Sequence, residues 1–409
     1  MPQMSSLIKA AALAACLGNP SYAAAEFSAY GHAALRLSHT DGEESWTRGG
    51  FGRFDAADAD IALDGQLALD FRPADSLQFY LHTTARAEDT ANATRPVGVI
   101  EGFVDYRPLD TDSQTLVIRA GQQFLPSSME NVDDLWQSPY TLTFSAWNSW
   151  IGHEVRPIGL RLNYDYRFTN GNRLRLLGMA FRGNDTSGTS LAWGGWRFSQ
   201  RLSVYGETLP LPALPTLQTG GAFQVQNDEG TIPFAGDLDD ETGHAAMIDF
   251  ASSRVRLKAT WFDNRGDGRR FNDEWAWATD YVNLGFEWTP SNTVTIAGEW
   301  ADGATEFGPP QGGVKTTFDT AYLLASWTRG NHRLSARAET FGVDDVDGRP
   351  VDNSDDGSAF TVSHFYSAGQ FRFGTELMWV SGDRPALPES GLPPEDDTLQ
   401  LRFEVRYTF

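Results

Sequence analysis

The sequence predicts an all-β protein whose strands close into a transmembrane antiparallel β-barrel. Three observations support this fold class. Apolar and polar residues alternate with a period of two, short turns alternate with long polar connections, and the chain ends in an aromatic strand. Successive side chains of a strand point to opposite faces, so the alternation describes strands with one apolar and one polar side.

Residues 60–72 give the clearest alternation. Leu63, Leu67 and Leu69 fall on one face, and Asp64, Gln66 and Asp70 fall on the other. The same pattern recurs in six further segments: 77–81, 158–168, 255–261, 282–288, 371–379 and 399–409. The segments 189–209 and 317–328 are ambiguous because they carry large residues on both faces. We expect strands in all of these places.

Turn residues separate some strands, and longer polar stretches separate others. The short turns are 73–75, 170–172, 290–292 and 330–331, and the long connections are 39–59, 125–155, 210–241, 263–276, 303–316, 343–357 and 382–396. Short turns at one end and long loops at the other are typical of membrane barrels. A soluble β-sandwich also alternates, but its strands are shorter, whereas these approach the roughly 9–11 residues that cross a bilayer.

The alternating segments and the turns between them predict about eighteen strands. Sixteen is the alternative, because such barrels favour even numbers. Tryptophans near strand ends suit the aromatic girdles of a membrane interface. They are Trp193, Trp261, Trp288, Trp300 and Trp379.

The first 25 residues are predicted to be a secretory signal peptide. Lys9 precedes a short apolar stretch, and Ala23 to Ala25 offer a small-residue cleavage site. A lipoprotein signal with a lipidated Cys16 is the alternative. Residues 26–409 then form the barrel, and either signal takes the chain out of the cytoplasm.

The last strand, 399–409, ends in Phe409. It looks like the terminal strand of Gram-negative outer-membrane proteins, whose final aromatic residue is read by the barrel-assembly machinery. This resemblance implies insertion in the outer membrane, in contact with lipid and lipopolysaccharide.

Composition excludes several function classes. A formal charge of -22 would repel nucleic-acid phosphates, so no nucleic-acid partner is expected. One cysteine rules out a disulfide scaffold and a Cys-ligated zinc site. The seven histidines stand in no hydrolase motif, so we predict neither an enzyme nor a cofactor or metal.

A barrel of sixteen to eighteen strands leaves an aqueous channel, which predicts passive diffusion of small polar solutes or ions. The loop 125–155 is expected to fold inward and narrow the pore as the third loop. Its candidate constriction residues are Glu130, Asp133, Asp134, Trp136, Trp147, Trp150 and Glu154. The candidate wall residues facing them are Arg86, Arg119, Arg161 and Arg175.

Residues 119–131 resemble a known family. Arg119 to Pro126, followed by Met129-Glu130-Asn131, is similar to the G-Q-F-x-P-x-x-x-E-N stretch of the phosphate-selective porin O/P family, and 155–160 is similar to its next strand. The resemblance implies a homotrimeric channel of sixteen strands whose third loop folds inward. It does not carry over the phosphate specificity, because the lysines reduce to Lys258 and Lys315 in a strongly acidic chain.

Several alternatives stay open at this point. A structural or adhesive barrel would show the same strand pattern, and a barrel enzyme is a weaker candidate. The tryptophans of 125–155 could form a stacking surface for sugars or could simply pack. The preference for anions or cations is not decided by the sequence.

Overall fold

A computed structural model describes residues 25–409, except 57, 89, 91–93, 230–236, 272–273 and 309–312. Apart from Ala25, the expected signal peptide lies outside the described residues, and so does Cys16. Among the described residues, no helix has the length and apolar character needed to cross a membrane.

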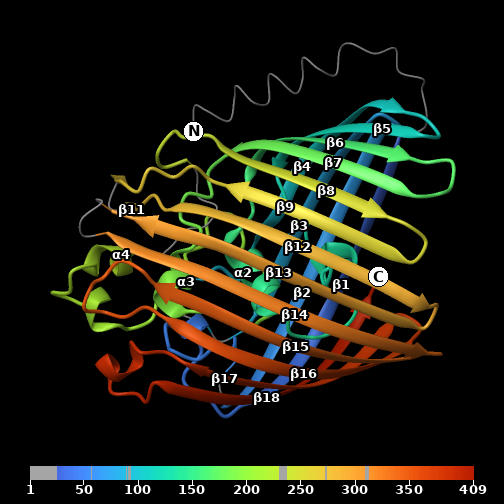
Figure 1. Cartoon of the computed structure of the whole chain (residues 1–409). Helices are drawn as coiled ribbons and strands as arrows, with labels where there is room; N and C mark the ends of the chain where they lie inside the picture. The colour runs from blue at the N-terminus through green and yellow to red at the C-terminus, as the bar shows by residue number, and fades with distance from the viewer. Residues whose placement is uncertain are drawn as a thin grey trace.

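Sixteen antiparallel strands close into one barrel (Figure 1). They are β1 (Glu26–Thr40), β2 (Asp58–Ala74), β3 (Leu77–Ala87), β4 (Val97–Asp110), β5 (Gln114–Gln122), β6 (Ile158–Arg167), β7 (Arg173–Arg182), β8 (Gly243–Ala251), β9 (Val255–Asp263), β12 (Ala278–Ser291), β13 (Val294–Phe307), β14 (Val314–Arg329), β15 (His332–Asp345), β16 (Asp355–Ala368), β17 (Phe371–Asp383) and β18 (Glu395–Thr408). Each strand pairs with its neighbours in sequence order, and β1 pairs with β18 to close the ring.

The preferred count of eighteen strands is therefore wrong, and the alternative of sixteen is confirmed. A two-residue pair, β10 (Arg270–Phe271) and β11 (Glu274–Trp275), forms a separate small sheet. The ambiguous segment 189–209 contains no strand. Its large residues occupy both faces because nearly all of the segment is buried inside the molecule.

The two ends of the barrel differ as expected. Seven short turns join strands at one end, which we call the turn end, and eight longer loops join them at the loop end. The loops are L1 (41–57), L2 (88–96), L3 (123–157), L4 (183–242), L5 (264–277), L6 (308–313), L7 (346–354) and L8 (384–394). Phe409 exchanges two backbone hydrogen bonds of 3.0 Å with Gly31 at the turn end, which completes the β1–β18 seam.

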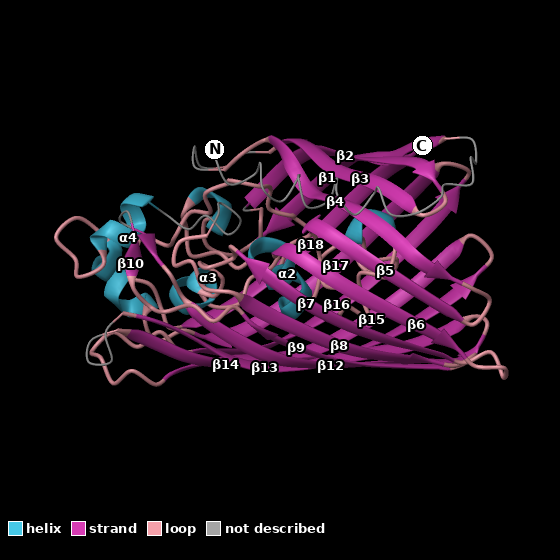
Figure 2. Ribbon diagram, turned by 90° about the horizontal axis from the view of Figure 1, so that it is seen from above, coloured by secondary structure: helices cyan, strands magenta, loops and turns pink. Residues whose placement is uncertain are grey.

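The loops contain the short helices. These are η1 (Trp46–Arg48), η2 (Asp134–Trp136), α2 (Ala146–Glu154), α3 (Thr189–Gly194), η3 (Pro215–Leu217), α4 (Gln224–Glu229) and η4 (Leu387–Ser390). Figure 2 shows α2 inside the barrel and α4 beyond its loop end. L3 therefore folds inward, as the sequence analysis expected.

The outer surface of the barrel is apolar. Trp261, Trp288, Trp300 and Trp379 are exposed on it, as predicted for interfacial girdles. The prediction that Trp193 belongs to an interfacial girdle is wrong. This residue lies in α3 and is buried with Phe307 and Phe223 at the barrel mouth. Leu, Phe and Trp side chains are exposed on most of the strands, which would be unfavourable in water, so a lipid environment fits this surface.

Much of the lumen is filled. Apolar side chains of L3 and L4 pack against inward-facing residues of the wall in one buried cluster, which we call the lumen core. From the loops it includes Phe124, Phe144, Trp147, Trp150, Trp196, Phe198 and Val204, and from the wall Phe181, Phe262, Tyr281, Phe318, Phe341, Met378 and Val380.

Candidate functional site: the occupied lumen

Three glutamates of the wall hold the backbone of L3. Glu299 on β13 accepts from the amide N of Met129 at 3.1 Å, and Glu339 on β15 accepts from that of Ala146 at 2.9 Å. Glu376 on β17 accepts from two amides, of Leu142 at 2.6 Å and Thr143 at 2.8 Å. Hydrogen bonds to ionised acceptors are about twice as strong as neutral ones, so this side of the wall fixes L3 firmly.

A buried ion pair joins L3 to the same part of the wall. Glu130 of L3 and Arg337 of β15 are both fully buried and form a salt bridge. Glu130 also accepts from the hydroxyl of Thr141 at 2.9 Å and from the amide N of Ser145 at 2.8 Å. Because its carboxylate also organises L3 itself, Glu130 is a structural centre of the loop.

Cations of the wall strands β6 and β9 bind carbonyl oxygens of L3. Lys258 Nζ donates to the carbonyls of Pro126 at 2.8 Å and Ser128 at 2.7 Å. Arg161 donates to the carbonyl of Phe124 at 2.8 Å. Donors and acceptors alternate around the lumen, since Glu101 on β4 also accepts from the amide N of Phe124 and Arg337 on β15 also donates to the carbonyl of Thr143.

The helix α2 presents its tryptophans to the lumen core. Trp147 and Trp150 meet the ring of Tyr281 edge-on, with centroids 4.9 and 5.7 Å apart. Trp136 instead stacks on Phe124, with ring centroids 4.3 Å apart and an interplanar angle of 5°. These contacts support the packing interpretation of the tryptophans over a sugar-stacking surface, since Trp147 and Trp150 are buried.

L4 enters the lumen as well and rests on L3. Ser203 N donates to the carbonyl of Gly152 at 3.1 Å, and Ser199 N donates to Ser149 Oγ at 3.1 Å. Arg201 of this stretch bonds Glu88 of L2 at 2.8 Å and Glu207 of L4 itself. Its sequence pattern allowed a strand here, and the structure shows a second inserted loop instead.

Glu154 connects the two inserted loops. Its buried carboxylate accepts from Trp150 Nε1 at 2.7 Å, and from the amide N atoms of Gly188 at 3.0 Å and Ser190 at 2.9 Å. Burial raises the pKa of the Glu154 carboxyl. The residue therefore ties α2 to the start of α3 rather than facing a solute.

His153 lies where three loops meet. Its Nε2 is 2.7 Å from Ser199 Oγ of L4, and its ring centroid is 4.6 Å from that of Trp46 in L1. Burial, together with the positive charges of Arg197, Arg201, Arg156 and Arg86, holds the pKa of His153 well below its ordinary value. His153 is a neutral contact at ordinary pH, and a proton on it would add charge to a cationic surrounding.

A hollow of about 270 Å³ remains between L3 and the wall strands β4, β5, β6 and β9. We call it the cationic hollow, because four cations and two carboxylates line it: Arg119, Arg161, Arg256, Lys258, Glu101 and Asp133. Arg119 forms a two-point pair with Asp105 at 2.7 and 2.8 Å, and Arg256 pairs with Asp249. Arg161 and Lys258 bind carbonyl oxygens. The lining itself thus holds four cations against two carboxylates, and Asp105 and Asp249 beside it balance two of the cations.

The predicted loop residues thus have separate environments. Asp133 and Asp134 are exposed on L3, and Asp133 lines the cationic hollow with Trp136. Glu130, Trp147, Trp150 and Glu154 are buried in the interior of L3 and its contacts. Their role as a pore constriction remains a prediction.

Two of the four predicted wall arginines line the cationic hollow, and the other two lie elsewhere. Arg119 and Arg161 line the cationic hollow. Arg86 donates to the carbonyl of Leu202 in L4 at 2.7 Å, and Arg175 pairs with Asp165 on the neighbouring strand at 2.7 Å. Within the described part of the chain, no ion pair joins any of these four arginines to an acid of L3.

Sequence reasoning missed the residues that do hold L3: Glu299, Arg337, Glu339, Glu376 and Lys258. All five are polar members of alternating segments, so the alternation places them on the inner face. What the sequence lacked was a signal for which inward residue meets which loop, since Glu130 and Arg337 are separated by 207 positions.

A group of carboxylates at the loop end could in principle hold a cation. Oxygens of Asp185, Asp237 and Asp239 lie within 4.8 Å of one another. Burial and the two neighbouring acids raise the pKa of Asp185 to about 7. These oxygens already accept backbone N–H groups, and Asp237 pairs with Arg182, so we assign no site there.

Comparison with solved structures identifies the fold. OmpT, an outer-membrane protein of Vibrio cholerae, superposes with a TM-score of 0.54 at 10% identity, covering 95% of this chain and 98% of that one. DcaP, an outer membrane channel of Acinetobacter baumannii, superposes with a TM-score of 0.53 at 12% sequence identity, covering 96% of this chain and 99% of that one. An anion-selective porin from Comamonas acidovorans superposes with a TM-score of 0.50 at 9% sequence identity, covering 94% of this chain and 100% of that one.

No family model matches the chain, and no curated protein matches its sequence. At such low sequence identity, the structural similarity shows the fold alone. The chain has the fold of outer-membrane channel proteins, a closed sixteen-stranded antiparallel barrel.

Proposed function

We propose that this protein is a porin-like channel of the Gram-negative outer membrane, through which small polar or charged solutes diffuse. The observation that carries the proposal is the lumen. A sixteen-stranded barrel is wide enough for an aqueous passage, and here two loops narrow that passage without any strand crossing it. Loops held by side chains can shape and gate a channel, whereas a purely structural barrel needs no such insertions.

The solute class follows from the cationic hollow. This space runs between L3 and the wall and carries an excess of positive side chains. Rings of charged residues in a narrow pore favour counter-ions of opposite sign. We propose that anions cross more readily than cations, even though the whole chain is acidic, because the narrow section and not the net charge sets selectivity.

The resemblance of residues 119–160 to phosphate-selective porins supports the inward L3 and a cationic wall, and we propose that the chain is related to that family. A homotrimer is supported by the trimer form of OmpT of Vibrio cholerae, which shares the fold. We also propose recognition of Phe409 by the assembly machinery after removal of the leader, and contact with lipopolysaccharide at the loop end.

An enzyme is a weaker candidate. His153 Nε2 and Ser199 Oγ, 2.7 Å apart, have the spacing of a base and a nucleophile. Both residues are buried to 1% exposure or less at the contact between L3 and L4. A substrate has no access to this pair, so we assign it a structural role.

The test is the reversal potential of the refolded protein in a planar bilayer under a potassium chloride gradient. The wild type should be anion-selective. Arg161→Gln and Lys258→Gln should lower the chloride-to-potassium permeability ratio several-fold, because each removes a positive charge from the cationic hollow. Arg107→Gln, at the turn end of β4, is the control and should leave the ratio unchanged.

Cation selectivity in the wild type would overturn the solute class while leaving the channel intact. Absence of conductance both in the wild type and in a variant with the inserted part of L4 removed would overturn the channel itself.

A further inference from the structure

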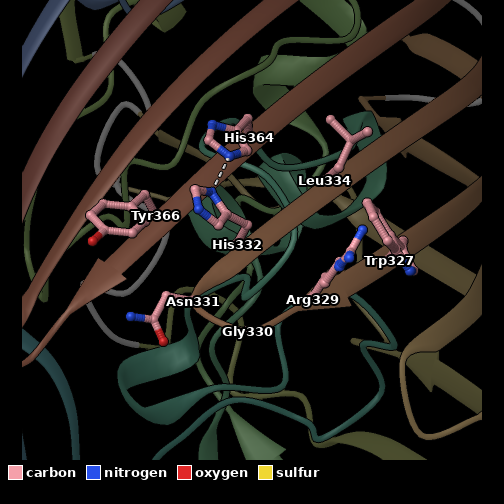
Figure 3. Close-up of a pocket in the computed structure, with 8 residues that line it drawn as sticks. All are labelled: Trp327, Arg329, Gly330, Asn331, His332, Leu334, His364 and Tyr366. Carbon is pink, nitrogen blue, oxygen red and sulfur yellow. Dashed lines mark hydrogen bonds between the residues drawn. The ribbon is translucent and has the colours of Figure 1, made fainter.

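Two histidines converge on the outer face of the barrel, away from the lumen. His332 begins β15, directly after the short turn that follows β14, and His364 lies on the neighbouring strand β16 (Figure 3). Both are exposed beside a surface hollow of about 720 Å³. Its lining also includes Trp327, Arg329 and Tyr366. The hollow is at the turn end, so it belongs to a surface that the channel function does not use.

The two imidazoles are held in fixed relative positions. His332 Nδ1 lies 3.1 Å from His364 Nε2, and the rings are 5.3 Å apart with an interplanar angle of 16°. The strand register places His332 opposite Tyr366 and His364 opposite Leu334. The ring of Tyr366 packs 4.9 Å from that of His332. Paired strands and this aromatic contact therefore position both nitrogens before any ligand arrives.

The short distance between the nitrogens selects the kind of ligand. A hydrogen bond between two imidazole nitrogens needs one N–H donor and one free lone pair. If both nitrogens carried protons, two N–H groups would point at each other and the pair would separate. The observed arrangement thus shares one proton between two bases, which suits a cation at that position and disfavours an anion.

We propose that His332 and His364 form a binding site for a divalent transition-metal ion such as Zn²⁺, Ni²⁺ or Cu²⁺. The ion would replace the shared proton and bind His332 Nδ1 and His364 Nε2. Metal–imidazole bonds are about 2.0–2.1 Å long, so two nitrogens 3.1 Å apart can reach one ion. Imidazole is a preferred ligand of these three metals, and water completes the coordination from the open side.

Arg329 lines the same hollow and opposes this binding. Its guanidinium stays charged at any ordinary pH and repels a divalent cation. The site is therefore expected to have moderate affinity, and neutralising Arg329 should raise that affinity several-fold.

The experiment titrates Zn²⁺ into the refolded full-length protein, with the affinity measured by calorimetry and the ligands identified by electron paramagnetic resonance of bound Cu²⁺. The wild type should bind one ion per chain, with two nitrogen ligands in the Cu²⁺ spectrum. His332→Asn and His364→Asn should each lower the affinity at least about tenfold, since losing a ligand costs more than losing its support. Arg329→Gln should bind more tightly.

His39→Asn is the matched control, because His39 is also exposed on the outer face but stands opposite Ala59 and Leu401. Its affinity should equal that of the wild type, and all variants should run as folded barrels. Unchanged binding in both the His332 and His364 variants would overturn the proposal. So would a wild type that binds no metal ion, or one that binds inorganic phosphate at this pair instead.

Discussion

The two inserted loops fill the same lumen but are held differently. L3 is bound to the wall on both sides, by Glu299, Glu339 and Glu376 from one half and by Lys258 and Arg161 from the other. The inserted stretch of L4, residues 196–205, bonds to other loops: to Arg53 of L1, Glu88 of L2, and Ser149 and Gly152 of L3. It also bonds wall residues, namely Asp355, Gly342, Arg86, Val99, Glu404 and Arg406.

From this difference we infer that L3 is the more firmly fixed of the two loops and that L4 moves more easily. Wall strands are constrained by the barrel ladder, so a loop bonded to them on two sides keeps its place. The inserted stretch of L4 has fewer charged anchors on the wall than L3, and contacts between loops open at lower free energy than paired strands. We infer that L3 sets the shape of the passage and L4 controls how much of it is open.

The strongest test of this comparison replaces residues 196–204 with a short Gly-Ser linker. Removing the inserted stretch of L4 should raise single-channel conductance several-fold, because Trp196, Phe198 and Val204 leave the lumen core. Replacing Asp347–Val351 at the tip of L7 is the control and should leave conductance near the wild-type value. Equal conductance in all three proteins would contradict a gating role for L4.

A second test loosens L3 at its buried ion pair. Arg337→Met leaves Glu130 and Glu339 in the interior without their arginine, and breaking a buried pair costs about 3–5 kcal/mol. The variant should lose stability in guanidinium unfolding and show noisy, variable conductance.

The control for that test is Arg175→Met. Arg175 pairs with Asp165 on the wall, and a quarter of its side chain is exposed. Partly exposed pairs contribute roughly 0–1 kcal/mol, so little change is expected. If the two variants were equally stable, the ion pair would not be what fixes L3.

The smallest expected effect is a pH dependence of the contact between L3 and L4. Burial lowers the pKa of His153, so the folded protein resists its protonation while the unfolded chain accepts a proton near the ordinary value of about 6.5. Stability from this group is therefore present above that pH and is lost as pH falls below it. A proton would also meet the arginines at positions 86, 156, 197 and 201.

Channel opening should thus become more frequent as the pH is lowered from 7.5 to 5. The opening frequency is recorded in the same planar bilayer. The His153→Asn variant should show a flatter pH response, since asparagine can still bond Ser199 but does not titrate. An unaltered response in that variant would assign the acid sensitivity to other groups.

Local sequence patterns were enough to predict most of the strands and the two different ends of the barrel. Alternation over 60–72 or 399–409 reflects a local rule, since every second side chain of a strand faces the same way. Turn residues such as Gly330 and Asn331 act over a few positions, and so do the long polar loops. The inward L3 was also accessible, through its resemblance to a known family.

The strand number, the second inserted loop and the partners of the charged residues could not be predicted from local patterns, because they depend on how the whole barrel is assembled. Residues 189–209 carry large side chains on both faces, which a period-two pattern cannot distinguish from a strand, and they turned out to fill the lumen. Glu130 meets Arg337 across 207 positions of chain, and His332 meets His364 across 32. Such pairings depend on strand register and barrel closure, which are properties of the assembled barrel and not of any local segment.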